Sequence, residues 1–159
     1  MAVEIERKFL LLNDSWQQHV VSKNLMRQGY FAGPEKHQPR ASIRIRISNQ
    51  HAYLNIKSYE LGISRQEYEY EIDLNDAEKM LSTLCEKPLI EKIRYEVVVG
   101  LHTWEIDVFS GDNNGLVVAE IELDHEKEYF DKPDWLGEEV STDARYYNVS
   151  LIKHPFKDW

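Results

Sequence analysis

Acidic and basic side chains alternate with apolar ones in residues 4–9, EIERKF. Successive side chains of a β-strand point to opposite faces, so Glu4, Glu6 and Lys8 would share one face while Ile5 and Phe9 lie on the other. Two acids and a base in line can hold a cation beside an anion, although a solvent-exposed strand can carry the same pattern. A functional site is favoured over a solvent-exposed strand only if later strands repeat this pattern of charges.

The alternation recurs in later segments, where charged residues occupy one face and aliphatic or aromatic residues the other. The acids of these faces are Glu67, Glu69, Glu71, Glu105, Asp107, Glu120 and Glu122, and the bases are Arg44, Arg46, Lys57, Lys92 and Arg94. Paired carboxylates favour a hard cation, because Mg²⁺ and Mn²⁺ prefer carboxylate oxygens and water. Paired Arg and Lys favour phosphate, which a guanidinium meets with two parallel hydrogen bonds. On facing walls, the two sets would form a metal–polyphosphate site.

The charges on these faces also balance. The bases counted are Lys8, Arg44, Arg46, Lys57, Lys92 and Arg94, and the acids that cancel them are Glu4, Glu6, Glu69, Asp107, Glu120 and Glu122. One or two divalent cations would leave a surplus of about +2 to +4, close to the charge of about −4 on a bound triphosphate. The alternative is a barrel filled by acids and bases that pair only with one another.

The strand pattern predicts the fold. Strands are expected over residues 4–12, 26–32, 41–47, 52–58, 65–72, 91–96, 104–109 and 117–123. Most are joined by hairpin-length connections, which favours an antiparallel barrel or a strongly curved sheet. The charged face is expected inside, because an amphipathic helix near Met80 needs an apolar outer face to pack on. A solvated face would also carry Thr, Ser and Gln among its charges.

Helices are expected outside the strands. A short helix over residues 16–21 would follow a cap at residues 13–15. Asn75, with Glu78 as its capping-box partner, would begin a helix over residues 76–85. The apolar stripe of that helix would be Ala77, Met80, Leu81 and Leu84.

The remaining connections are read from turn and cap residues. Gly33, Pro34 and Pro39 mark a loop, residues 124–130 read as a polar helix, and Pro133 and Gly137 break the chain. Thr142 would cap a last helix over residues 143–152, which carries Arg145.

Composition limits the class of protein. The 159 residues fit one domain, 1–159, and a net charge of −9 argues against a general binder of nucleic acid or anionic membranes. The first residues lack the apolar core of a signal peptide, and no apolar run is long enough to span a bilayer. The single Cys85 permits no internal disulfide and fits the cytoplasm, as a small buried side chain and not a nucleophile. Six scattered histidines make a zinc site improbable.

Residues 4–8 match the ExExK signature of the CYTH superfamily, the triphosphate tunnel metalloenzymes, and the chain resembles that family over nearly its whole length. The further matching segments are residues 28–30 (QGY), 44–46 (RIR), 56–58 (IKS), 64–69 (SRQEYE), 91–95 (EKIRY), 105–109 (EIDVF), 120–122 (EIE), 137–140 (GEEV) and 145–146 (RY). A lone ExExK is a weak signal, whereas this ordered set is specific.

The resemblance implies an α+β, mainly β fold: an eight-stranded antiparallel barrel, or tunnel, with a charged interior, helices packed outside and a C-terminal plug helix. It is most similar to the compact bacterial members that hydrolyse inorganic tripolyphosphate to pyrophosphate and phosphate with one or two Mg²⁺ or Mn²⁺ ions. Other activities on this fold remain alternatives: a thiamine triphosphatase, a nucleoside triphosphatase or an adenylate cyclase. A non-catalytic polyphosphate-binding module is an alternative of another class, and a homodimer is an open alternative for the assembly.

The resemblance also implies roles for individual residues. Metal would be held by Glu4, Glu6, Glu67, Glu69, Asp107, Glu120 and Glu122. Triphosphate would be bound by Lys8, Arg44, Arg46, Lys57, Lys92, Arg94 and Arg145. Lys57, with Tyr30 beside it, would activate the attacking water; the alternatives are that Lys57 only binds phosphate and that Tyr30 only packs in its strand. Ala144 departs from the lysine that similar proteins often carry before Arg145, which puts the contacts of the plug helix, and hence the substrate preference, in question.

Overall fold

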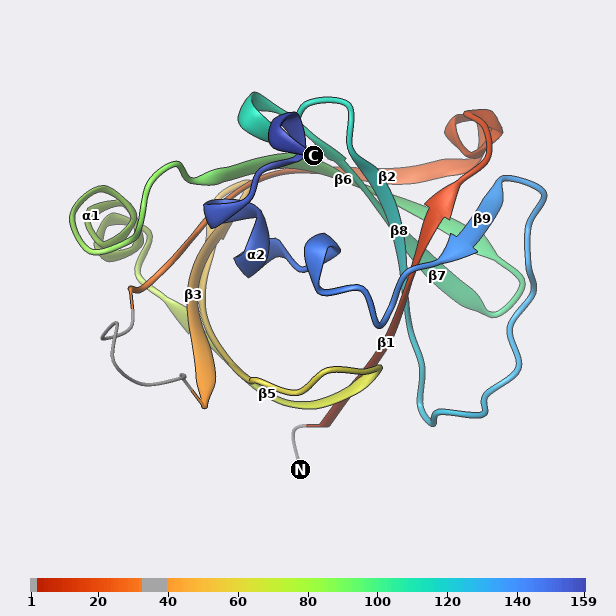
Figure 1. The fold of residues 1–159 in the computed structure, drawn as a ribbon, viewed down its shortest axis with the longest axis horizontal. Helices are drawn as coiled ribbons and strands as arrows, with labels where there is room; N and C mark the ends of the chain where they lie inside the picture. The colour runs from red at the N-terminus through yellow and green to blue at the C-terminus, as the bar shows by residue number, and fades with distance from the viewer. Residues whose placement is uncertain (1–2, 33–39) are drawn as a thin grey trace.

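Nine antiparallel strands form one sheet in the computed structural model, which describes residues 3–32 and 40–159 (Figure 1). The strands are β1 (Val3–Leu11), β2 (Val20–Tyr30), β3 (Ala41–Ser48), β4 (His51–Ser58), β5 (Ser64–Ile72), β6 (Ile90–Val99), β7 (His102–Phe109), β8 (Val117–Glu122) and β9 (Leu136–Glu139). Their order is β5-β4-β3-β2-β6-β7-β8-β1-β9, and β5 also pairs with β1. The first eight strands therefore close into a barrel, as the sequence predicts.

Strand β1 joins the two ends of the sheet. Its first residues, Val3 to Ile5, pair with β5, and residues 6–9 pair with β8. Phe9 and Leu11 pair with β9, which extends the barrel wall by one short strand. The acids of residues 4–9 therefore lie at the seam where the barrel closes.

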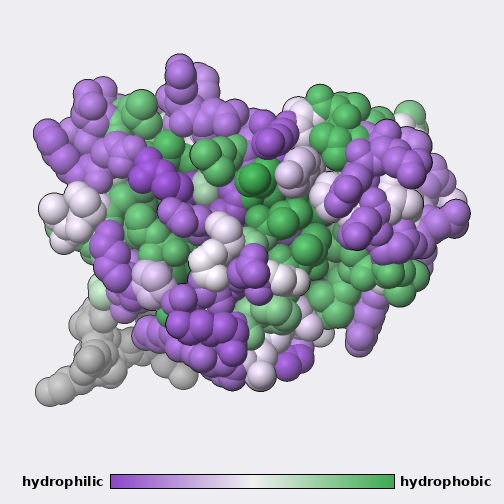
Figure 2. All heavy atoms as spheres, turned by 90° about the horizontal axis from the view of Figure 1, so that it is seen from above, coloured by the Kyte–Doolittle hydropathy of each residue, from purple (hydrophilic) through white to green (hydrophobic). Residues whose placement is uncertain are grey.

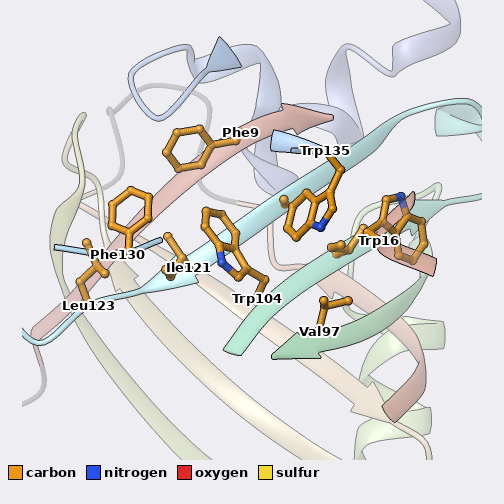
Figure 3. Close-up of a cluster of buried hydrophobic side chains, with 10 residues drawn as sticks. Phe9, Trp16, Val97, Trp104, Ile121, Leu123, Phe130 and Trp135 are labelled. Carbon is orange, nitrogen blue, oxygen red and sulfur yellow. The ribbon is translucent and has the colours of Figure 1, made fainter. Parts of the chain in front are cut away.

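Apolar side chains on the outer face of the barrel pack under loops and helices. The largest cluster comprises Phe9, Trp16, Val97, Trp104, Ile106, Ala119, Ile121, Leu123, Phe130 and Trp135. Figure 3 shows Trp104 of β7 between Phe130 and Trp135, which come from the long connection after β8. Because this side of the strands is covered, the alternate, charged side faces the lumen, and the predicted charged interior is confirmed.

Helix α1 (Leu74–Thr83) covers β3 and β4 from outside. Ala77 and Leu81 are buried against Ile45, Ile47 and Ala52. The cap is Asp73, whose side chain accepts from the backbone amides of residues 75 and 76, so the predicted Asn75 cap is wrong by two residues. The predicted roles of Glu78 and Leu84 are wrong too. Glu78 forms an ion pair with Arg27, and Leu84 is 60% exposed.

Within the described residues, four short 3-10 turns and a short helix complete the elements: Ser15–His19, Gly111–Asn113, Ala144–Tyr146, Phe156–Asp158 and α2 (Asn148–Lys153). The helix predicted over residues 16–21 is therefore a 3-10 turn, and the following strand begins at Val20, six residues earlier than predicted. The predicted helix over residues 124–130 is an irregular loop, and the predicted break at Gly137 lies inside β9. The last helix is split in two and is capped by Asp143, not Thr142. The predicted loop at Gly33, Pro34 and Pro39 lies outside the described residues.

The C-terminal segment crosses the ring of strands. Figure 1, which looks down the barrel, shows α2 and the residues before it lying within the outline of the ring. After α2 the chain turns back to the β7–β8 connection, where the Phe156 amide donates to Asn113 Oδ1 at 2.9 Å. Figure 2, seen from above, shows apolar side chains gathered between more hydrophilic flanks. No helix within residues 3–32 and 40–159 is long and apolar enough to cross a membrane.

Replacing Gly29 should destabilise the contact between the barrel and the segment after α1. A Cβ at Gly29 would lie 2.8 Å from both Cys85 Cβ and Leu89 Cδ2. Gly29→Ala should therefore lower the free energy of unfolding by about 1–3 kcal/mol, the usual cost of overpacking. Urea denaturation measures this, and the exposed strand variant Thr103→Val should stay within about 0.5 kcal/mol. Equal stability of both variants would contradict the close packing.

Candidate active site: a charged tunnel

The lumen of the barrel is a cavity of about 510 Å³ to which all eight closing strands contribute. The predicted site residues that line it are Glu4, Glu6, Lys8, Tyr30, Arg44, Arg46, Lys57, Glu67, Glu69, Lys92, Arg94, Glu120 and Glu122. The structure therefore brings together most of the predicted site. Two predicted residues, Asp107 and Arg145, are not among the described residues that line the cavity.

Asp107 lies beneath the lining and holds two bases in place. It is fully buried, and Lys92 Nζ lies 2.7 Å from its Oδ2. Arg94 contacts both carboxylate oxygens, through Nε at 2.7 Å and Nη2 at 2.8 Å. The structure thus places Asp107 behind the cavity wall with both carboxylate oxygens paired to bases, and its predicted role as a metal ligand stays a prediction. Period-2 alternation gives the face of a residue but not its depth in the barrel.

Burial and ion pairing shift the pKa values of Asp107 and Lys92 in opposite directions. Burial raises the pKa of Asp107, but Arg94 and Lys92 outweigh it and hold that pKa below its ordinary value. Burial also lowers the pKa of Lys92 to about 8, although Asp107 opposes the shift. Lys92 additionally donates to Asn148 Oδ1 at 3.1 Å, so a residue of α2 shares this base with Asp107.

Lys8 and Glu120 form a second buried pair close to the C-terminal segment. Their charged atoms are 3.4 Å apart, and Lys8 Nζ donates to the carbonyl of Tyr146 at 3.2 Å. Burial raises the pKa of Glu120, but the neighbouring Lys8 and Arg94 hold it well below its usual range. The neighbouring bases therefore favour the ionised form of Glu120.

On the opposite wall, bases of β3 and β4 meet acids of β5 and β1. Arg44 lies 3.7 Å from Glu67, and Lys57 lies 2.9 Å from Glu4 and 3.6 Å from Glu67. The Lys57 ammonium donates to both oxygens of Glu4. Arg46 contacts Glu69 at 2.9 Å, and the Glu69 side chain is 42% exposed at the mouth.

Some acids of the lumen lack enough positive partners. Glu6 makes no ion pair within the described part of the chain; burial, together with Glu120 and Glu4, raises its pKa well above the ordinary value. Burial and nearby acids also raise the pKa values of Glu4 and Glu122, although Lys57 opposes this. Mutually repelling carboxylates form a donor set suited to a hard divalent cation. As the side chains stand, no three acidic, His or Cys residues of the described ranges are grouped closely enough to hold one.

Tyr30 lines the cavity but is separated from Lys57 by strand β3. Its register partner is Arg44, whereas Ser42 lies opposite Lys57. The Tyr30 hydroxyl accepts from Gln28 Nε2 at 3.3 Å. Tyr30 and Lys57 thus line the same cavity from strands on either side of β3, and the predicted pairing of the two in catalysis stays a prediction.

Arg145 points away from the tunnel, which corrects the prediction that it reaches in. Its guanidinium pairs with Asp143 at 2.7 Å and lies over the rings of Tyr146 and Trp159. The C-terminal segment instead places Tyr147, Asn148 and Val149 against the cavity. The break between the 3-10 turn and α2 turns Arg145 outward, and a continuous helix over residues 143–152 would not have this break.

Several lining residues were given no individual role in the sequence, although Glu105 was placed on a charged face. Arg65 lies 3.8 Å from Glu4, and Glu105 contacts Arg94 at 2.5 Å. Each lies two residues from a predicted site residue on its strand, so the alternation of faces alone indicates that both point into the lumen. Tyr147 and Asn148 follow a turn, where no periodic signal exists. The ring of Tyr147 lies under Lys8 and Arg65, at 5.8 and 5.2 Å from its centre.

Comparisons with known proteins agree over nearly the full length. The CYTH domain profile matches residues 2–155. An inorganic triphosphatase of Acetivibrio thermocellus is 47% identical over 160 residues, which cover 100% of this chain and 99% of that protein. One of Nitrosomonas europaea is 38% identical over 152 residues, which cover 93% and 95%. A crystal structure of an inorganic triphosphatase gives a TM-score of 0.65 at 32% identity, covering 96% and 95%.

Removing the charge of Glu6 should stabilise the metal-free protein at high pH. Because the folded-state pKa of Glu6 is raised, its contribution to stability is present below the ordinary value of 4.5 and is lost as pH rises through the folded value. Glu6→Gln should therefore raise the free energy of unfolding at pH 8 by about 1 kcal/mol or more.

Urea denaturation in EDTA at pH 8 and pH 4 measures the difference, which should shrink at pH 4. The same variant should gain less stability than the wild type from added Mn²⁺. A variant that is less stable than the wild type at pH 8 would show that Glu6 is not repelled by its neighbours.

Proposed function

The chain belongs to the CYTH domain family, and on this premise we propose that it hydrolyses inorganic triphosphate to pyrophosphate and phosphate. The observation that carries the proposal is the lumen itself, where bases of β1, β3, β4, β5 and β6 converge on one cavity with carboxylates among them. Two relatives that are 47% and 38% identical over nearly the full chain are inorganic triphosphatases, which supports the same reaction.

The bases would bind the phosphates. Arg44 and Arg46 project from one wall, and Lys92 and Arg94 project from another. In the absence of substrate these bases are paired with carboxylates of the protein. When triphosphate enters, the bases would exchange these carboxylates for phosphate oxygens. The low-dielectric surroundings of the buried bases strengthen these contacts relative to water.

Carboxylates that line the cavity would hold Mg²⁺ or Mn²⁺. The residues proposed for this are Glu4, Glu6, Glu67, Glu69, Glu120 and Glu122, whereas both oxygens of Asp107 are already used by Lys92 and Arg94. When bound, a divalent cation neutralises phosphate charge and makes a bound water more acidic. Binding of the cation would also relieve the repulsion between carboxylates that contributes to the raised pKa of Glu6.

In the proposed reaction, water attacks a terminal phosphorus of the triphosphate. The P–O bond that bridges this phosphorus to the rest of the substrate breaks, and pyrophosphate leaves. Lys57 is the proposed residue for directing that water, and Tyr30 is the proposed second group from the neighbouring wall. In the structure the ammonium of Lys57 donates to Glu4, and this charged form suits binding of a phosphate oxygen. To take the proton of the attacking water, Lys57 would have to act in its neutral form, with the lone pair of Nζ turned to that water. A charge-preserving variant separates the two roles.

Substrate choice and the role of Lys57 can be tested together. Phosphate release should be fastest from tripolyphosphate when compared with ATP, thiamine triphosphate and pyrophosphate, and EDTA should abolish it. Lys57→Ala should lower kcat by about a hundred-fold or more, the usual contribution of a positioned proton-transfer group. Lys57→Arg keeps the charge but gives up no proton near neutral pH. Near-wild-type turnover of this variant would assign Lys57 to phosphate binding.

The exposed Lys23 on the outside of β2 provides the matched control, and Lys23→Ala should leave kcat and KM unchanged. Faster release from a nucleotide or thiamine triphosphate than from tripolyphosphate would replace the proposed substrate. Absence of release from all four substrates with Mg²⁺ and Mn²⁺ would leave a binding module in its place.

Arg145 and Arg44 should differ sharply in their effects on substrate affinity. Arg145 lies outside the cavity against Asp143 and Trp159, whereas Arg44 lines it. Arg44→Ala should raise KM for tripolyphosphate by about ten-fold or more, as expected for loss of charged hydrogen bonds. Arg145→Ala should change KM by less than about three-fold in the same steady-state assay. A large effect of Arg145→Ala would mean that the C-terminal segment rearranges around the substrate.

A further inference from the structure

Asn55 is an uncharged residue buried within the charged wall. It lies in the middle of β4, its side chain is fully buried, and it is not among the described residues that line the cavity. Its register partners are Arg44 on β3 and Glu69 on β5, so its side chain belongs to the face that carries the charges.

The amide nitrogen of Asn55 donates to two carboxylates at once. Nδ2 lies 3.0 Å from Glu67 Oε1 and 2.5 Å from Glu69 Oε2. This orientation follows from the chemistry, because turning the amide would direct its carbonyl oxygen at two carboxylates. Both hydrogens of one NH₂ group are therefore used to hold the two acids of β5.

The ion pairs that these acids make with bases of the described residues fall on the same oxygens. Glu67 Oε1 also lies 3.6 Å from Lys57 and 3.7 Å from Arg44. Glu69 Oε2 also accepts from Arg46 at 2.9 Å. The second oxygen of each carboxylate takes no part in these contacts. One oxygen of each acid is thus fixed against the wall, while no base within residues 3–32 and 40–159 holds the other; Glu67 in addition has Glu4, a further carboxylate of the lumen, as its neighbour.

We propose that Asn55 is a positioning residue that acts through Glu67 and Glu69, anchoring one oxygen of each so that the other is held ready for a divalent cation that accompanies the triphosphate. The proposal rests on the proposed function for its turnover readout, but its cation-binding readout does not. Groups that hold a ligating carboxylate commonly change metal affinity by about 10–100-fold when removed.

The test compares two side chains of the same shape. Asn55→Thr keeps one hydroxyl donor, whereas Asn55→Val keeps none, and both residue types suit a β-strand. Mn²⁺ binding, measured by electron paramagnetic resonance without substrate, should weaken by about ten-fold or more in Asn55→Val and by an intermediate factor in Asn55→Thr. KM for tripolyphosphate at limiting Mn²⁺ should follow the same order. At saturating Mn²⁺, kcat should recover to within about three-fold of wild type, since the carboxylates themselves remain.

The control is Gln28→Leu, which removes the other fully buried amide of the wall. Gln28 donates to Tyr30 and Asn148 but to no carboxylate, so its loss should leave Mn²⁺ affinity unchanged. Circular dichroism melting verifies that each variant is folded. Should Asn55→Val not fold, the pair Asn55→Ser and Asn55→Ala makes the same comparison with smaller side chains.

Equal Mn²⁺ affinity of Asn55→Val and wild type would overturn the proposal, as would equal weakening in the Thr and Val variants or in Gln28→Leu. A wild-type protein that binds no Mn²⁺ would overturn it as well. If the wild type binds Mn²⁺ with the predicted order of variants but does not hydrolyse tripolyphosphate, the proposed function fails while the role of Asn55 stands.

Discussion

Pairing between buried charges is the constraint on which this barrel depends. Isolated ions are very costly to bury, so each base near the closed side needs an acid within reach. Asp107 meets this need for Lys92 and Arg94, and Glu120 meets it for Lys8. The free energy that holds the strands in place comes from the apolar outer face, where the Trp104 cluster is packed under a loop. The lumen is thereby left free to carry groups that serve a ligand at some cost to stability.

The pairing is incomplete on the acidic side, and this imbalance gives the tunnel its chemical character. Glu6 has a raised pKa because it is buried beside other carboxylates. Asn55 holds Glu67 and Glu69 close together despite their like charges. An arrangement that optimised the metal-free protein would replace such acids, so their presence fits a site that is completed by cations and phosphate. Stability and ligand binding make opposite demands on these positions.

Period-2 alternation allowed the barrel and its charged face to be predicted, because a strand with one packed side must sort its residues by face. Helix boundaries were predicted less well. Asp73 competes with Asn75 for the same cap, and only the packing of Ala77 and Leu81 on β3 and β4 decides between them. Strand β9 has no alternating pattern by which the sequence predicts it. It pairs with Phe9 and Leu11 of β1, which β5 leaves unpaired.

For the site, the alternation of side chains along each strand placed the charged residues on the correct face. It could not tell how deeply each residue is buried in the barrel wall. Asp107 and Glu105 share a face of β7, yet Asp107 is fully buried and Glu105 borders the cavity. Arg145 was misplaced because its direction is set by a turn and by stacking on Trp159. Asn55 gave no signal, and Gln28 appeared only as part of the matching segment 28–30, since an amide on a strand is common and only three-dimensional contacts show what it holds.

The route of β1 through the barrel also has a consequence for how the chain folds. Glu6 lies opposite Glu122, so the edge of β1 that carries residues 6–9 finds its partner only when β8 is available, although Val3 to Ile5 can pair earlier with β5. Contacts of such wide sequence separation slow folding. On the ribosome, β1 would therefore wait with an unpaired edge that can associate with other chains. The face that gathers its carboxylates from both ends of the sequence is thus assembled last, and a nascent chain that stops before β8 has a strand edge but no tunnel.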